Sequence, residues 1–291
     1  MENPILTLDT SAINHLADDP ESEALIAGLT AGFFVRHSFS SVSEVIATTD
    51  PVRRSQLIAV WTRLLSSGDC IDPQHEVIRK MVSRFEAPAP FDWATVDVRF
   101  IEVESEILRA EVFTDELAAQ EREESRALKK RFHDGFDKAK PAFDKLFASG
   151  DDKIPGSVSE LVIRLQEGGA YWKLAGDIYA GVSKKSPDEA TLRRFVAECD
   201  PFRALMVAVC TAQYERCFRE KNGGPSLRAG RIDTFMAVSL PYCHRFLTGD
   251  RGQLACYNEV VSIANLGATV QLYDEFRNGF LLAGETTGAA R

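Results

Sequence analysis

The stretch PILTLDTSAINHLA, residues 4–17, contains the local pattern that decides the fold. Its apolar beginning, residues 4–8, predicts a short buried strand, and the polar residues that follow predict the start of a helix. Asp9 lies at the junction, where it either caps the helix or presents a carboxylate at the end of the strand. A strand that leads directly into a helix is the building unit of an α/β protein.

The same unit recurs on both sides of a long middle section. Buried strands are predicted at residues 33–37, 69–72, 245–248 and 268–273. Helices are predicted between the strands, so the strands are expected to run parallel. The sequence therefore predicts a three-layer α/β/α sandwich with a central parallel sheet.

The middle of the chain has a different character. APAPFD, residues 87–92, interrupts the alternation, and most of the following hundred or so residues show only helical periodicity. This divides the chain into a first part of the sandwich, an insertion, a second part and a tail that we expect to be disordered. Their predicted bounds are 1–86, 87–200, 201–280 and 281–291.

Composition limits the classes of function. The chain has 291 residues and a hydrophobic fraction of 45%, enough for a sizeable core. It shows no secretory signal and no membrane-length apolar run, so we expect a cytoplasmic protein with no membrane contact. The 6 cysteines form no Cys-x-x-Cys pair, which favours reduced thiols over a zinc site. A net charge of −9 argues against a surface that binds phosphates everywhere, although bases are concentrated in residues 203–231.

Four acids lie in apolar surroundings that suit a solvated carboxylate poorly: Asp9, Glu44, Asp233 and Asp250. Asp9 and Asp250 each follow a predicted strand, and ligand sites of parallel sheets lie beyond the carboxyl ends of the strands. Carboxylates that converge without a basic partner repel one another, and a divalent cation removes that conflict. Oxygen ligands suit Mg²⁺ or Mn²⁺, which can acidify a bound water for attack on a phosphodiester. The four acids are therefore the predicted metal ligands and catalytic residues.

The segments LTLDTS, SSVSEVIA, RIDTFMAV and RFLTGDRGQ, in this order, resemble the motifs of the PIN-domain family. The resemblance covers roughly residues 4–85 and 201–275. It implies an α/β/α sandwich and a Mg²⁺- or Mn²⁺-dependent nuclease that usually acts on RNA. Ser11 and Thr248 match polar residues that lie near the metals in the family. The sequence departs from the family in the long insertion between Glu44 and Asp233.

Other residues are candidates for substrate binding. Arg228 and Arg231 shortly precede Asp233, and an arginine suits bidentate contact with a substrate phosphate. We therefore expect a metal-dependent endoribonuclease that cuts single-stranded or loop RNA. The insertion is expected to shape the substrate channel or an oligomer contact, for example in a homodimer.

Plainer interpretations remain open at this point. Asp9 and Asp250 would each serve as a helix N-cap, and Glu44 and Asp233 would favour the start of a helix through its dipole. The same chemistry also fits the toxin of a toxin–antitoxin pair, inhibited by a protein partner. A non-catalytic RNA-binding or scaffold protein would keep the fold without needing the metal. A haloacid-dehalogenase type of phosphatase is disfavoured, because Asp9-Thr10-Ser11 lacks the second Asp of that motif.

Overall fold

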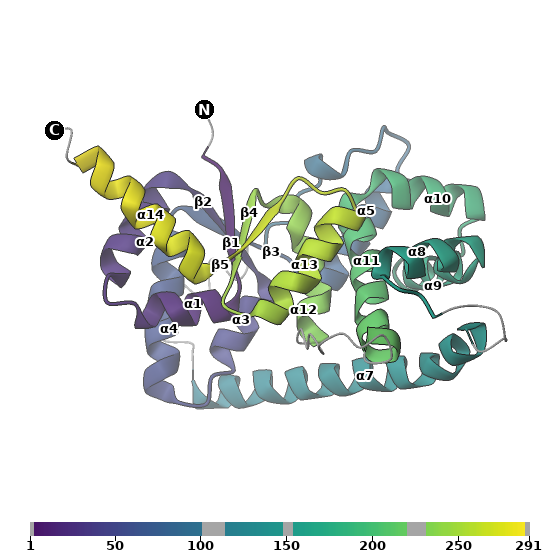
Figure 1. Cartoon of the computed structure of the whole chain (residues 1–291), viewed down its shortest axis with the longest axis horizontal. Helices are drawn as coiled ribbons and strands as arrows, with labels where there is room; N and C mark the ends of the chain where they lie inside the picture. The colour runs from purple at the N-terminus through teal and green to yellow at the C-terminus, as the bar shows by residue number, and fades with distance from the viewer. Residues whose placement is uncertain (1–2, 101–113, 148–153, 220–230, 289–291) are drawn as a thin grey trace.

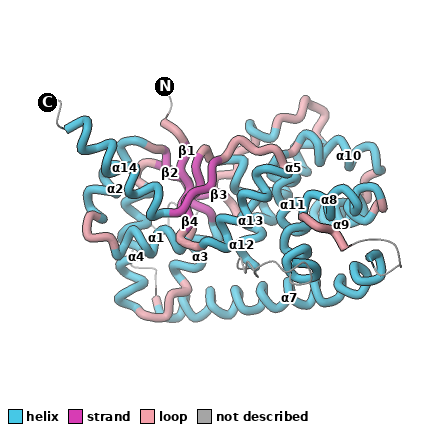
Figure 2. The backbone as a smooth tube through the Cα atoms, viewed as in Figure 1, coloured by secondary structure: helices cyan, strands magenta, loops and turns pink. Residues whose placement is uncertain are grey.

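Within the described residues, five strands form one all-parallel sheet (Figures 1 and 2). The structure is a computed structural model, and it describes residues 3–100, 114–147, 154–219 and 231–288. The strands are β1 (Ile5–Leu8), β2 (Phe34–Ser38), β3 (Gly68–Ile71), β4 (Arg245–Thr248) and β5 (Thr269–Leu272). Each predicted strand is present, and each lies within one residue of its predicted bounds. The prediction of a central parallel sheet is confirmed.

The order of the strands fixes where a site is to be sought. The sheet has the order β3-β2-β1-β4-β5, so the chain adds β2 and β3 on one side of β1 and then returns to add β4 and β5 on the other. β1 and β4 are joined in register at Leu8 and Leu247. The backbone N–H of Asp9 donates to the carbonyl of Leu247 at 3.0 Å. In open parallel sheets, ligands bind beyond the carboxyl ends of the strands where the order reverses, which here is between β1 and β4.

Helices cover both faces of the sheet, as the alternation of the strand side chains requires. On one face, Leu6, Leu8 and Leu247 pack against helices in a core that includes the fully buried Trp61. These helices are α1 (Thr10–Asp18), α2 (Ser22–Gly32), α3 (Phe39–Ile46), α4 (Pro51–Leu65) and α14 (Tyr273–Gly288). On the other face, Phe246 packs against Tyr257. The elements there are α11 (Asp200–Tyr214), η4 (Ala237–Tyr242) and α13 (Arg251–Ile263).

The predicted insertion packs closely against the second part of the sandwich. Phe195 is fully buried between Phe85 and Phe202, so three distant segments share one core. The helices of this core, beside α11, are α5 (Gln74–Glu86), α8 (Val158–Glu167), α9 (Ala170–Ser183) and α10 (Glu189–Glu198). A short helix, η1 (Trp93–Thr95), leads out of α5. The helices of the insertion therefore extend the sandwich.

One long helix, α7 (Asp115–Phe147), connects the two ends of the molecule along the lower edge in Figure 1. It contacts α3, α12 (Arg231–Met236) and the π-helical turn η3 (Glu215–Arg219). Residues 97–100 belong to the stretch expected to be helical, but they are not helical, because Arg99 forms an antiparallel bridge with Ile71 of β3. Helix α14 continues to Gly288, through most of the tail predicted over 281–291. No described helix combines the length and the apolar character needed to cross a membrane.

Candidate functional site

Asp9 occupies the first position after β1, at the point where the strand order reverses. Its side chain is 5% exposed and accepts hydrogen bonds from the backbone N–H of Ala12 at 2.7 Å and from the hydroxyl of Thr248 at 2.8 Å. The hydroxyl of Ser11 lies 2.8 Å from both carboxylate oxygens. Burial raises the pKa of Asp9 to about 6 against the opposing effect of these hydrogen bonds, and the charge of Glu44 adds to the increase.

Asp9 differs from the other buried acids of the described chain in having no basic partner. Asp69 forms a bidentate pair with Arg36, with both N–O distances at 2.7 Å. Asp72 pairs with Lys80 at 2.5 Å. No described lysine or arginine forms an ion pair with Asp9. Its negative charge is therefore the least compensated of the three buried carboxylates.

The carboxylate of Asp9 also keeps room for another ligand. Its two oxygens offer about four acceptor positions. At most three protons reach them, one each from the Ala12 amide and from the hydroxyls of Ser11 and Thr248. The Thr248 proton has a second acceptor, because the side-chain oxygen of Gln253 lies 2.6 Å from the hydroxyl. A cation at Asp9 therefore fits the donors and acceptors that are present.

Glu44 is brought to this site by the order of the strands. It lies on α3, which directly follows β2, the neighbour of β1. Ser38 caps the start of this helix, because its hydroxyl accepts the backbone N–H of Ser41 at 3.2 Å. The half-buried Glu44 accepts a hydrogen bond from the Thr10 hydroxyl at 2.6 Å. The structure thus places Glu44 against Thr10, the neighbour of Asp9, near enough for its charge to raise the pKa of Asp9.

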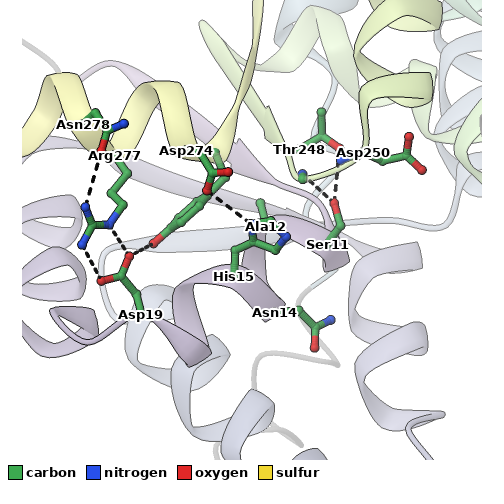
Figure 3. A network of polar contacts seen from close by, with 12 residues as sticks. Ser11, Ala12, Asn14, His15, Asp19, Thr248, Asp250, Asp274, Arg277 and Asn278 are labelled. Atoms are coloured by element: carbon green, nitrogen blue, oxygen red, sulfur yellow. Dashed lines mark hydrogen bonds and ion pairs between the residues drawn. The ribbon is translucent and has the colours of Figure 1, made fainter.

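Thr248 and Ser11 connect the end of β4 to the end of β1 (Figure 3). The backbone N–H of Asp250 donates to the Thr248 hydroxyl at 2.9 Å, and that of Gly249 donates to the Ser11 hydroxyl at 2.6 Å. The two hydroxyls lie 3.3 Å apart. Both residues therefore hold the loop after β4 against Asp9, which is consistent with their predicted place near the acids.

Asp250 lies in the same loop, but its carboxylate is exposed and is used as a helix cap. Its Oδ1 accepts the backbone N–H groups of Gly252 at 2.6 Å and Gln253 at 3.2 Å. In Figure 3 the carboxylate is directed away from Ser11. Asp9 also caps its helix, α1, so the capping interpretation of both aspartates is confirmed. Capping uses one oxygen of Asp250.

The remaining predicted residues are placed only in part. Asp233 and Arg231 belong to the first turn of α12, and their side chains lie outside the described part of the structure, as does all of Arg228. Among the described side chains, no three His, Cys, Asp or Glu residues gather closely enough to hold a metal ion. The described carboxylates that come together are Asp9 and Glu44, and the position of the Asp233 carboxylate decides whether a third joins them.

His15, which is not among the residues predicted from the sequence, lies beside this network (Figure 3). Its Nδ1 is 3.5 Å from a carboxylate oxygen of Asp274, and its ring meets that of Tyr273 edge-on, with 5.7 Å between the centroids. The spacing of four between Ser11 and His15 was the available signal, because residues four apart lie on one face of a helix. The partners from α14 could not be read from it, since α14 is far away in the sequence.

Comparison of the chain with family models, curated proteins and solved structures gives no match. The resemblance to PIN-domain proteins therefore rests on the residues quoted above.

Proposed function

We propose that the protein is a metal-dependent endoribonuclease of the PIN type, with its active site at the carboxyl ends of β1 and β4. The observation that supports this proposal most is the state of Asp9, which is buried, lacks a described basic partner and lies where the strand order reverses. An uncompensated buried carboxylate costs stability, so its presence at a ligand-binding position is best explained by a cationic ligand.

The proposed cation is Mg²⁺ or Mn²⁺, held by carboxylate oxygens of Asp9 and Glu44, together with Asp233 and Asp250. When bound, such an ion supplies an acidified water and neutralises charge on the phosphate. The protein's own groups orient the site. Thr248 and Ala12 fix the carboxylate of Asp9, and the Gly249 amide fixes the Ser11 oxygen. The Ser11 hydroxyl in turn directs its proton to the two oxygens of Asp9.

RNA as the substrate is supported by the resemblance to PIN-domain nucleases and by the basic residues that precede Asp233 in the sequence. We propose single-stranded RNA or an exposed RNA loop, with Arg228 and Arg231 binding the phosphates. A protein inhibitor, as in a toxin–antitoxin pair, and assembly as a homodimer are compatible extensions of this function. Both remain predictions.

The experiment that tests the proposal is cleavage of a labelled single-stranded RNA pool in Mn²⁺, in Mg²⁺ and in EDTA. Asp9→Asn and Glu44→Gln are compared with the wild type and with Asp188→Asn as the matched control. Asp188 is also a helix-capping aspartate, at the start of α10, and it accepts the N–H of Thr191 at 2.7 Å. We expect metal-dependent cutting that the Asp9 and Glu44 variants lose and the Asp188 variant keeps.

Two results would contradict the proposal. Cutting that persists in EDTA or in both site variants would place the active site elsewhere. RNA binding by the folded wild type without cutting, unchanged in Asp9→Asn, would establish a non-catalytic binding protein. Growth arrest on expression that requires Asp9 and is relieved by a neighbouring small protein would identify the toxin form of the same activity.

A further inference from the structure

We propose that His15 is a catalytic residue of this site, which donates a proton to the leaving oxygen of the cleaved phosphodiester. This inference rests on the proposed function. It adds a proton donor, a role that the predicted metal-binding acids do not fill. Carboxylates that hold a cation are charged and cannot serve as the acid, whereas an imidazole can exchange a proton near neutral pH.

Helix α1 makes different contacts on different faces, and only one of these faces lies toward the site. On one face, Asn14 and Asp18 bind the guanidinium of Arg53 on α4. On another face, Ser11 and His15 lie side by side toward the loop after β4 (Figure 3). The imidazole therefore belongs to the same surface as the Ser11 hydroxyl, which touches the carboxylate of Asp9.

The imidazole is held by residues of α14 in an orientation that leaves one nitrogen for a ligand. Asp274 lies 3.5 Å from Nδ1, and Tyr273 supports the ring edge-on. Tyr273 is itself fixed, because its hydroxyl donates to Asp19 at 3.2 Å, which also binds Arg277. Because Nδ1 is the nitrogen nearer to Asp274, we assign the proton exchange with the substrate to Nε2.

The backbone of Gly249 packs closely against His15 and Ser11. A Cβ atom at Gly249 would lie 3.0 Å from Nε2 of His15 and 3.1 Å from the Ser11 hydroxyl oxygen. Both distances are tighter than ordinary van der Waals contacts, so a side chain at this position would have to displace its neighbours. The absence of a side chain lets the loop after β4 pack against both His15 and Ser11, so the imidazole lies directly beside the Ser11 end of the site. On the other side of His15 is a shallow pocket lined by Asp18, Tyr273 and Asn278.

The grouping of Ser11, His15 and Asp274 does not make Ser11 a nucleophile. The Ser11 hydroxyl directs its proton to Asp9 and accepts the N–H of Gly249. Its proton is therefore not available to His15, as a serine nucleophile would require. The proton exchange that we assign to Nε2 is therefore with a bound ligand and does not involve Ser11.

The proposed step is hydrolysis of the phosphodiester by water. A water oxygen forms a bond to phosphorus, and the bond from phosphorus to the leaving oxygen breaks. The electron pair of that bond stays on the leaving oxygen, which takes the proton from Nε2 of His15. The attacking water releases one proton to solvent, and the neutral imidazole takes up a proton from solvent before the next turnover. Among the described residues, the charged or titratable groups around His15 are Asp274, Tyr273 and Arg277 of α14, with Asp18 and Asp19 at the end of its own helix.

The test compares a substrate that needs a proton on its leaving group with one that does not. Single-turnover rates in Mn²⁺ are measured on RNA and on bis(p-nitrophenyl) phosphate, whose p-nitrophenolate leaves without protonation. His15→Gln is compared with His75→Gln, because His75 is an exposed histidine beside an acid, 3.7 Å from Glu76, next to the opposite edge strand. We expect His15→Gln to cut RNA about 100-fold more slowly, with a change below about 3-fold on the nitrophenyl ester.

A second variant tests the position of the imidazole. Gly249→Ala keeps His15 but pushes its ring away from the loop after β4, so we expect it to slow RNA cutting as well. The inference is overturned if His15→Gln cuts RNA within about 3-fold of the wild type and of His75→Gln, or if it slows both substrates equally, which would indicate a binding or structural role. An inactive wild type would instead contradict the proposed nuclease function, on which the inference depends.

Discussion

At the scale of the residue, the charge of Asp9 lowers the stability of the folded protein but is needed for the proposed cation site. Its pKa in the folded protein is about 6, against an ordinary value of 3.8. The folded protein therefore holds the proton more tightly than the unfolded chain, and stability falls as pH rises from about 4 to about 6. The ionised carboxylate costs at most about 3 kcal/mol above that range.

We therefore expect Asp9→Asn to stabilise the metal-free protein at pH 8 by about 1–3 kcal/mol, and to change its stability little at pH 3.5. Asparagine keeps the cap of α1, because its side-chain oxygen accepts the Ala12 amide equally well. Urea unfolding at the two pH values measures the effect. Asp69→Asn is the control with the opposite sign, since it breaks the bidentate pair with Arg36 and should destabilise the protein. A destabilised Asp9→Asn variant at pH 8 would contradict the argument.

The burial of His37 in β2 should make the protein less stable as the pH is lowered. Its side chain is fully buried against Trp61, and neither ring nitrogen has a hydrogen-bond partner among the described residues. Burial lowers the pKa of His37 from 6.5 to about 3. The unfolded chain therefore binds the proton that the folded protein excludes, and stability decreases as pH falls below about 6.5.

We expect His37→Leu to remove this dependence. Its advantage in free energy of unfolding over the wild type should grow by about 1.4 kcal/mol for each pH unit between 6 and 4. Chemical denaturation at pH 6, 5 and 4 gives the slope. A difference between the two proteins that stays constant with pH would show that His37 is not buried in its neutral form.

At the scale of the element, substitutions at Asp250 can distinguish its role as the N-cap of α13 from a role as a metal ligand. Asparagine keeps the side-chain oxygen that accepts the first amides of α13, whereas alanine does not. We expect Asp250→Asn to unfold within about 0.5 kcal/mol of the wild type, and Asp250→Ala to lose about 1 kcal/mol. If Asp250 is also a metal ligand, both variants lose metal-dependent cutting. Full activity in Asp250→Asn would leave Asp250 with the structural role alone.

The elements also show how far the sequence predicts this molecule. The strands were predictable because each is a short apolar run bounded by turn residues. No local pattern indicated the strand order that brings Glu44 near Asp9. Residues 97–100 were not predictable, because their non-helical form depends on pairing with β3 rather than on local pattern. The contact of His15 with Asp274 joins α1 to α14 and has no local signal.

At the scale of the whole molecule, the sandwich and the helical insertion are held together by a shared core. The ring of Phe195 on α10 contacts Phe85 on α5 and Phe202 on α11. Removal of residues 90–200 would expose this core, so an insertion-free chain is a poor way to test the role of the insertion. Helix α7 reaches both α3 and α12, the helices that carry Glu44 and Asp233, so the insertion is placed to influence the site as well.

The stability of the whole molecule in the presence of a cation should also show whether Asp9 belongs to a cation site. A cation that binds the folded protein alone adds about 2.7 kcal/mol at a concentration 100 times its Kd. We expect Mn²⁺ to raise the Tm of the wild type at pH 8 and to leave that of Asp9→Asn unchanged, even though the variant starts from the higher Tm. Thermal unfolding across a Mn²⁺ titration measures both curves, with Ca²⁺ as a comparison for preference among oxygen-bound ions. Equal increases in the two proteins would mean that Mn²⁺ binds away from Asp9, and the buried carboxylate would then need a different explanation.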